Sequence, residues 1–386
     1  MQMSEEFRRK LQLYEEGKLP AEEREEVERE IEKMEAYQSY MDELMGKDRE
    51  AEAETADSLK EASIIRKGKW KARINTSFTV IGMVFLVMLI CSICTNLFYA
   101  AGEPNRMEHY KDIVTSTIAV TRPNVEVALS SNSNLFFTMD LHGKMRRQIG
   151  DERAVVGDFS FSFVFNRPGI GQMSWLNDHT NTAVFQFPNT FRQDSGQEWS
   201  KLEKLPEGTV TEAALSFDRM FTTDELLQQF KNKNMTPVWF AADTGLEKTS
   251  EESIVWNPVG FPYHPVWHHD DMRITSYKEQ KSGWFGKIVT KGGSYPAIDT
   301  YGSGELRNEN FMKTLRLLQD YRSITKTLAP SLQIDQTIQY LETNGVKLYG
   351  AVVTGPTKEI LKLKQEPWVA GIRVGEVRLW NWQDRP

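Results

Sequence analysis

The sequence is poor in the residues and motifs that stabilise small secreted domains or mark common enzymes. Only two of its 386 residues are cysteines, which excludes an extracellular framework held together by disulfides. The glycine-rich patterns of P-loop and Rossmann proteins, the G-x-S-x-G nucleophile motif and the H-E-x-x-H zinc motif are all missing. The chain is still 40% hydrophobic, so we expect two or three globular domains with sizeable cores.

Charge is absent from the 29 residues between Arg73 and Glu103. The core of this run, residues 78–100, reads FTVIGMVFLVMLICSICTNLFYA. About 20 apolar residues suffice for a helix to cross a bilayer, so we predict one transmembrane helix over residues 74–102. A buried core helix is rarely this long without a charge, and a cleaved signal peptide does not follow a long charged segment.

The residues before the apolar run indicate its orientation. Residues 66–73, RKGKWKAR, carry five positive charges and no negative one, and we call them the basic collar. By the positive-inside rule, we expect residues 1–73 in the cytoplasm and residues 103–386 outside a cell membrane that the chain crosses once. Cys91 and Cys94 fall inside the span, where we interpret them as small apolar side chains and not as a redox or metal pair.

Charge is distributed unevenly along the chain. Residues 1–60 contain 19 acidic and 10 basic side chains, residues 61–73 have a net charge of +4, and the remainder has a net charge of −2. This pattern excludes a generally basic nucleic-acid-binding protein, so we expect no direct contact with nucleic acid.

The acidic N-terminal segment has the pattern of two amphipathic helices. Residues 4–16 and 21–45 both place apolar side chains at helical spacing, and Gly17 lies between them. We therefore predict a helical hairpin over residues 1–46, followed by a spacer and the basic collar over residues 47–73.

The apolar stripes of this hairpin have two interpretations. The helices can pack on each other, as a small hairpin or a coiled-coil dimer, or they can bind in a groove of a partner protein. Six to eight anchors would contribute about 10–20 kcal/mol if fully buried, whereas association costs about 4–15 kcal/mol. A large partner can bury all the anchors, and the negative charge favours a basic one, such as a transcription factor.

The region after the apolar run is expected to be α+β. We expect residues 103–200 to form a β-rich region, because residues 124–166 alternate apolar and polar side chains. Before these strands, residues 108–120 are expected to prolong the helix of the apolar run. Residues 201–386 contain two strand–helix–strand patterns separated by a loop-rich insertion at 244–305, and such a pair is typical of a ferredoxin-like split βαβ fold. The two patterns occupy residues 209–217, 222–230 and 235–243, and residues 346–353, 356–365 and 369–382.

The outer region offers no convincing set of catalytic residues. His264, His268, His269, Asp270 and Asp271 form one cluster, but a metal site would need ligands that converge from other segments. We interpret these side chains as loop residues and predict no enzyme activity, no cofactor and no metal.

Several long blocks of the sequence are similar to the sigma-factor-regulator family of Gram-positive bacteria. The strongest are GVKLYGAVVTGPTKEI (345–360), VGEVRLWNW (374–382) and LPEGTVTEAALSFDRMFTTDE (205–225). TRPNVEV (121–127) and EREIEKMEAYQ (28–38) are also similar, and the resemblance covers most of the chain outside residues 240–310.

The resemblance implies a membrane-bound anti-sigma factor. Such proteins hold an extracytoplasmic-function sigma factor inactive at the membrane and release it under cell-envelope stress, and some act with a small second membrane protein. The head here has no cysteine with which to build the zinc motif of another anti-sigma class. The residues expected to bind the sigma factor are Phe7, Leu11, Tyr14, Val27, Ile31, Met34, Tyr37, Met41 and Leu44.

A second function remains open from the sequence. The outer region would then be a ligand-binding sensor, and the cytoplasmic head would oligomerise or bind a partner other than a sigma factor.

Overall fold

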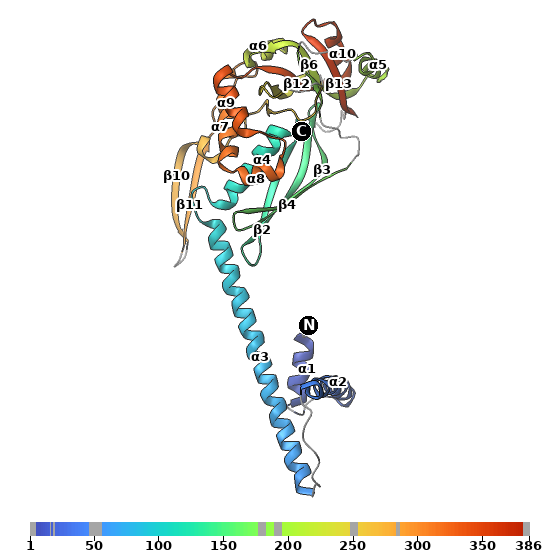
Figure 1. Cartoon of the computed structure of the whole chain (residues 1–386), viewed down its shortest axis with the longest axis vertical. Helices are drawn as coiled ribbons and strands as arrows, with labels where there is room; N and C mark the ends of the chain where they lie inside the picture. Colours follow the sequence, from blue (N-terminus) through green and yellow to red (C-terminus); the bar gives the residue numbers. More distant parts are fainter. Residues whose placement is uncertain are drawn as a thin grey trace. The chain divides into compact units, whose positions relative to one another are not determined.

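A computed structural model describes residues 5–15, 17, 20–45, 56–176, 183–188, 195–247, 254–282 and 286–380 (Figure 1). The chain divides into two compact units, Met1–Gly82 and Met83–Pro386. The expected mixture of helices and strands is confirmed.

The first unit is helical throughout its described part. It contains α1 (Glu5–Glu15), α2 (Ala21–Met45) and the beginning of α3 (Ala56–Ala100). Gly17, between α1 and α2, has a φ of 69°, a left-handed conformation that glycine adopts without steric cost. The two helices of the predicted hairpin are therefore present, joined by a short turn.

Helix α3 is longer than the span predicted from the sequence. It begins at Ala56, so the basic collar is part of the same helix as the apolar run. Among the described residues, one stretch is long and apolar enough to cross a membrane, Arg66–Ala100, and almost none of its most apolar part is buried by protein. The uncharged part of this helix is not covered by protein, so its apolar side chains need an apolar environment such as the interior of a bilayer.

The second unit begins with a helix packed on an antiparallel sheet. Helix α4 (Arg106–Thr121) starts at Asn105, whose side chain accepts a hydrogen bond from the backbone N–H of Glu108. Its buried face joins one hydrophobic core with the sheet that follows. The sheet has the order β1-β2-β3-β4, with β1 (Glu126–Ser133), β2 (Thr138–Ile149), β3 (Glu152–Val164) and β4 (Arg167–Trp175).

Strand β4 passes through Pro168, Gly169 and Gly171, residues that are more typical of a turn. A proline is tolerated there because β4 is the edge strand of this sheet, where a missing N–H costs no internal hydrogen bond.

A second, five-stranded sheet has the order β13-β6-β12-β7-β9, and all neighbours are antiparallel. It is built largely from the two strand–helix–strand patterns, which interleave because β12 lies between β6 and β7 and β6 lies between β12 and β13. The elements are β6 (Thr209–Phe221), α6 (Thr223–Gln229), β7 (Thr236–Ala242), β9 (Gly260–Pro262), β12 (Leu348–Pro356), α10 (Thr357–Leu361), η3 (Lys362–Gln365) and β13 (Val369–Leu379).

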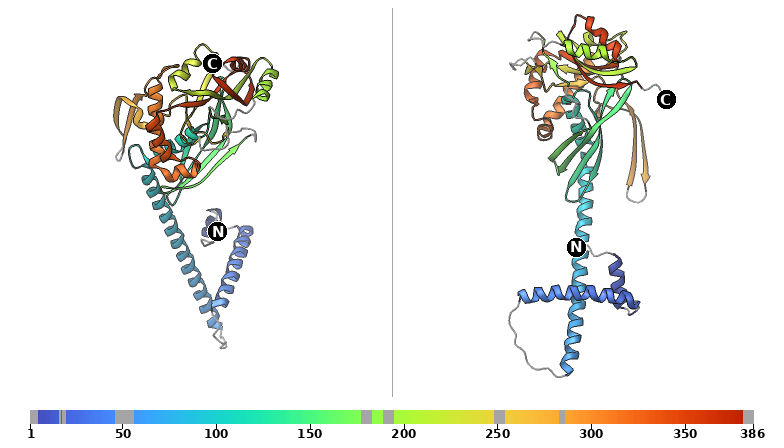
Figure 2. Two further views of the ribbon diagram at one scale, coloured as in Figure 1. Left: turned by 45° about the horizontal axis from the view of Figure 1, so that its top comes forward. Right: turned by 90° about the vertical axis from the view of Figure 1, so that its right-hand side faces the viewer.

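Further helices and short strands surround this sheet. Two consecutive helices after residue 303, α7 and α8, are separated at Tyr321. The segment at 244–305 includes a long β-hairpin that projects from the body of the unit (Figure 2). These elements are α5 (Gly196–Lys204), α7 (Gly304–Asp320), α8 (Arg322–Leu328), α9 (Ile334–Asn344), β5 (Phe185–Gln186), β8 (Ile254–Val255), η2 (His269–Asp271), β10 (Arg273–Ser282) and β11 (Gly286–Ser294).

A buried ion pair joins the two large sheets. Arg147 of β2 and Glu212 of β6 are almost completely buried, and their Nη1 and Oε2 atoms are 3.3 Å apart. The side-chain amide of Asn124, before β1, donates to Oε1 of Glu212 at 2.7 Å. The carboxylate of Glu212 is thus paired with Arg147 of the four-stranded sheet and with Asn124, which precedes that sheet. These contacts connect the two sheets.

We expect Arg147→Leu to lower the free energy of unfolding by about 3–5 kcal/mol, because it leaves the Glu212 carboxylate buried without its cation. The measurement is denaturant unfolding of the full chain in detergent micelles. As a control, Arg153→Leu removes a solvent-exposed partner of Glu126, 3.7 Å away, and should cost no more than about 1 kcal/mol. Equal losses for both variants would contradict the role of the buried pair.

Candidate functional site

The first candidate site is the hairpin of α1 and α2, which we call the head. Leu11 of α1 and Val27 of α2 are buried. Polar contacts flank them, since Lys10 lies 3.2 Å from a carboxylate oxygen of Glu26 and the Tyr14 hydroxyl donates to Glu28 at 3.2 Å. Part of the apolar stripe is therefore used to hold the two helices together.

The remaining predicted contact residues have different environments. Tyr14 and Ile31 are half-buried, whereas Met34 and Tyr37 are 38% and 70% exposed. Phe7, Met41 and Leu44 lie on the two helices, but their side chains are outside the described part of the structure. Met34 and Tyr37 thus offer apolar surface that the head does not bury itself.

Tyr40 was not among the residues predicted from the sequence, although it is 60% exposed. It lies three residues after Tyr37, so the two aromatic side chains are neighbours on α2. The Tyr-x-x-Tyr spacing was a usable signal, because exposed tyrosines are enriched in protein interfaces.

The first half of α2 exposes six glutamates between Glu23 and Glu32. Within the first unit, Glu35 also lies 2.9 Å from Arg66 of the basic collar. That pair is largely solvent-exposed and contributes less than about 1 kcal/mol, so a basic partner can replace it at little cost.

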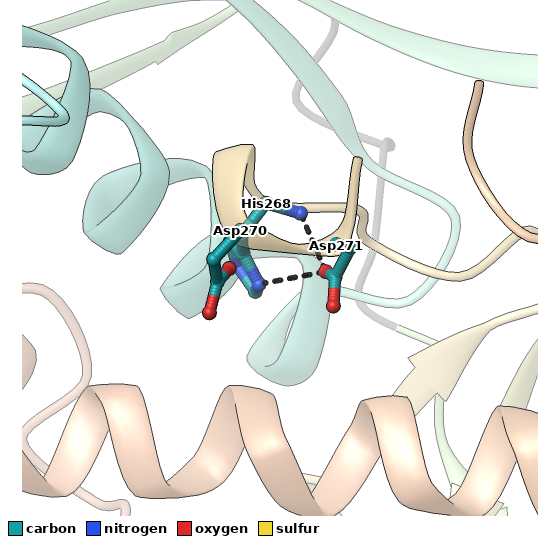
Figure 3. Close-up of side chains that lie close together, drawn as sticks. All are labelled: His268, Asp270 and Asp271. Carbon is teal, nitrogen blue, oxygen red and sulfur yellow. Dashed lines mark hydrogen bonds and ion pairs between the residues drawn. The ribbon is translucent and has the colours of Figure 1, made fainter. Parts of the chain in front are cut away.

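The second candidate site is the cluster at η2 in the second unit. His268, Asp270 and Asp271 point toward one another closely enough to hold a metal ion (Figure 3). Lys313 of α7 lies 2.8 Å from Asp270 and forms a short ion pair with Asp271, while Nε2 of His268 is 2.8 Å from the Ser116 hydroxyl. Burial lowers the pKa of His268, so the neutral imidazole is favoured. The ammonium of Lys313 thus already supplies the positive charge that a metal would bring.

A neighbouring carboxyl on α4 has an unusual proton affinity. Burial, and next the charge of Glu108, raise the pKa of Asp112 to about 6. Asp112 and Lys313 could not be singled out from the sequence, because their surroundings are assembled from α4, η2 and α7.

Two family models match the chain. The sigma factor regulator N-terminal model matches residues 62–154, and the sigma factor regulator C-terminal model matches residues 202–376. The chain belongs to the sigma factor regulator family. A relative from Bacillus subtilis (strain 168), the "Probable anti-sigma-M factor YhdL", is 27% identical over 389 residues, which is 98% of this chain and 100% of that protein. No solved structure matches the chain.

These findings confirm the resemblance read from the sequence. Membership of the family indicates a role in the regulation of a sigma factor. The single apolar helix fits a single-pass membrane protein. The head precedes the residues that the N-terminal family model matches, whereas the alignment with the relative covers nearly the whole chain.

Asp112→Asn should stabilise the chain at pH 7 by about 1–3 kcal/mol, because each unit of pKa shift corresponds to about 1.4 kcal/mol. The pKa of Asp112 is raised on folding, so the native state binds more protons than the unfolded state between about pH 4 and pH 6. The stability of the unmodified chain therefore falls as the pH rises through this window, and the variant removes that contribution.

The measurement is thermal unfolding of the full chain in detergent from pH 4 to pH 7. Asp151→Asn, which changes an exposed carboxyl in the turn between β2 and β3, is the control and should leave the profile unchanged. An Asp112→Asn profile parallel to that of the unmodified chain would refute the prediction.

Proposed function

We propose that the chain is a single-pass membrane protein that holds an extracytoplasmic-function sigma factor through its acidic head and releases it under cell-envelope stress. The observation that carries the proposal is the match to both sigma factor regulator models, the N-terminal one of which includes the apolar helix. The tether would keep the complex at the membrane and raise the effective concentration for recapture of a released sigma factor.

The proposed orientation places residues 1–73 in the cytoplasm and residues 103–386 outside. The basic collar at residues 66–73 supports it, because positively charged residues next to a span are retained on the cytoplasmic side. A sigma factor acts on RNA polymerase in the cytoplasm, so this is also the orientation in which the head meets its partner.

The proposed contact surface of the head consists of the nine predicted residues and Tyr40. Leu11 and Val27 would position the two helices, because the head buries them itself, and the exposed side chains of Met34, Tyr37 and Tyr40 would be inserted into the partner. The glutamates around them would accelerate the encounter with a basic sigma factor surface. The sigma factor would then be unable to use that surface for RNA polymerase or promoter DNA.

The outer region is proposed to act as the sensor. Its two interleaved strand–helix–strand units support a ferredoxin-like assignment, since the order β13-β6-β12-β7 places the fourth, first, third and second strands side by side. A small second membrane protein is a further proposed partner, on the grounds of the family resemblance alone.

A second candidate function is ligand binding by the outer region, with a head that oligomerises. It is favoured by a cavity of about 310 Å³ lined by Glu126, Arg153, Trp239 and His264, among other residues. The partial self-packing of the head agrees with this alternative as well.

Met34→Asp should weaken co-purification of the sigma factor with the full chain by at least about 30-fold, because burying an unpaired carboxylate costs 2 kcal/mol or more. Tyr37→Ala should have a comparable effect if it is a central anchor. The measurement is quantitative mass spectrometry of sigma factor recovered with the detergent-solubilised chain, and transcription from the promoters of that sigma factor should rise in parallel.

The matched control is Tyr277→Ala, which removes a tyrosine from β10 that is 57% exposed, compared with 70% for Tyr37. It should leave sigma factor recovery unchanged. If no sigma factor co-purifies with the unmodified chain while the chain forms a tight dimer through its head, the second candidate function replaces the first.

The orientation has its own test. Protease treatment of intact cells without their wall should digest the region after residue 103 and spare residues 1–73, as followed by antibodies to tags at the two ends. Digestion of the head with protection of the C-terminal region would reverse the proposed topology.

A further inference from the structure

The second unit presents two hairpin tips beside the C-terminal end of α3. We define the apolar tips as Leu135, Phe136 and Phe137, between β1 and β2, together with Val164, the last residue of β3, and Phe165, which follows it. We propose that the apolar tips insert into the lipid leaflet at that end of the span. The inference rests on the membrane crossing proposed above, and it adds a second membrane-contacting surface to the spanning helix.

The apolar tips are attached to α3 by directed hydrogen bonds. The backbone N–H of Phe136 donates to the sulfur of Cys91 at 3.3 Å, and the N–H of Phe137 donates to the Thr95 hydroxyl at 3.0 Å. Thr95 is completely buried at this contact, although it lies in the apolar run. The position of the first tip along the helix is therefore fixed by backbone contacts.

The second tip is fixed to the same helix one turn further on. The hydroxyl of Tyr99 donates to the carbonyl oxygens of Phe137 and Phe165, at 2.8 Å and 3.1 Å. The rings of Phe137 and Phe165 are stacked with centroids 4.4 Å apart, and Phe98 contacts both edge-on. Figure 2 shows the ends of these strands beside the upper part of α3.

The contact with Cys91 gives the depth of the tips. Cys91 follows Arg73, the last residue of the basic collar, by 18 positions in one continuous helix, or ~27 Å at 1.5 Å per residue. The hydrocarbon layer of a bilayer is about 30 Å thick. A span that starts at the collar therefore reaches the opposite edge of this layer close to Cys91, where the first tip makes its contact.

The chemistry of the apolar tips fits that depth. Residues 129–139 and 159–166 contain no formal charge, and Phe136 and Phe165 are 59% and 43% exposed. Ile93 and Leu97, at the same level of α3, are exposed apolar side chains as well. Aromatic side chains are favoured at the interface between hydrocarbon and headgroups, so lipid is the occupant that matches both the position and the composition.

The backbone of the apolar tips is strained. Phe136, Phe137 and Phe165 have φ angles of 59°, 56° and 56°, a conformation that bulky side chains rarely adopt. Glycine or asparagine would relieve that strain in a tip whose only task is to turn the chain. Phenylalanine at all three positions indicates that the aromatic side chains themselves are required there.

The test is photocrosslinking with p-benzoylphenylalanine in place of Phe136 in the full chain. The chain is reconstituted in vesicles of phosphatidylcholine and phosphatidylglycerol, irradiated, and analysed for covalent lipid adducts by mass spectrometry. Two matched positions receive the same group: Phe85, exposed in the middle of the apolar run, and Trp256, exposed directly after β8. We expect lipid adducts at Phe136 to approach those at Phe85 and to exceed those at Trp256 several-fold.

The outcomes separate this inference from the proposed membrane crossing. If lipid adducts are abundant at Phe85 but no more frequent at Phe136 than at Trp256, the inference is overturned and the membrane crossing stands. Crosslinks from Phe136 to a second copy of the chain in place of lipid would have the same meaning. Absence of adducts at Phe85 would overturn the crossing and the inference together. The same measurement at Phe165 provides an independent position on the second hairpin.

Discussion

One buried ion pair joins the two large sheets of the second unit. Arg147 and Glu212 come from different sheets, and neither charge has access to water. Arg147 lies in the segment matched by the N-terminal family model and Glu212 in the segment matched by the C-terminal one. The pair therefore joins the two parts by which the family is defined, and its high cost of disruption makes them behave as one body.

The same body is connected to the spanning helix at its other end. Strand β2 carries Arg147 close to one end and follows the first hairpin tip at the other, where the backbone is hydrogen-bonded to Cys91 and Thr95. Any rearrangement of the sheets that moves β2 along its length also acts on α3 through these bonds. The connection between the sheets and α3 therefore runs through packed side chains and directed hydrogen bonds.

Local sequence patterns predicted those helices and strands whose apolar residues recur at one regular spacing. The apolar run, the helices of the head and the strands at residues 209–217 and 346–353 all have strong patterns, and the described structure has helices or strands at each. The β10–β11 hairpin was not predicted because its described side chains are mostly exposed and show no alternation. Arg147 and Glu212 are separated by 65 residues, and the left-handed phenylalanines depend on contacts with α3, so neither follows from neighbouring residues. In the head, the sequence showed the stripe of apolar side chains. Which of these side chains are buried between α1 and α2 and which are exposed became clear only from the packing of the two helices.

The proline of strand β4 affects which other chains can pair with the edge of the four-stranded sheet. An uncovered sheet edge offers a row of donors and acceptors to any extended chain that passes, and a crowded membrane surface brings such chains close. Pro168 interrupts that row, because it has no N–H to offer. Pro168 thereby hinders the addition of a strand from another chain to the β4 edge of the four-stranded sheet, and so hinders aggregation through this edge.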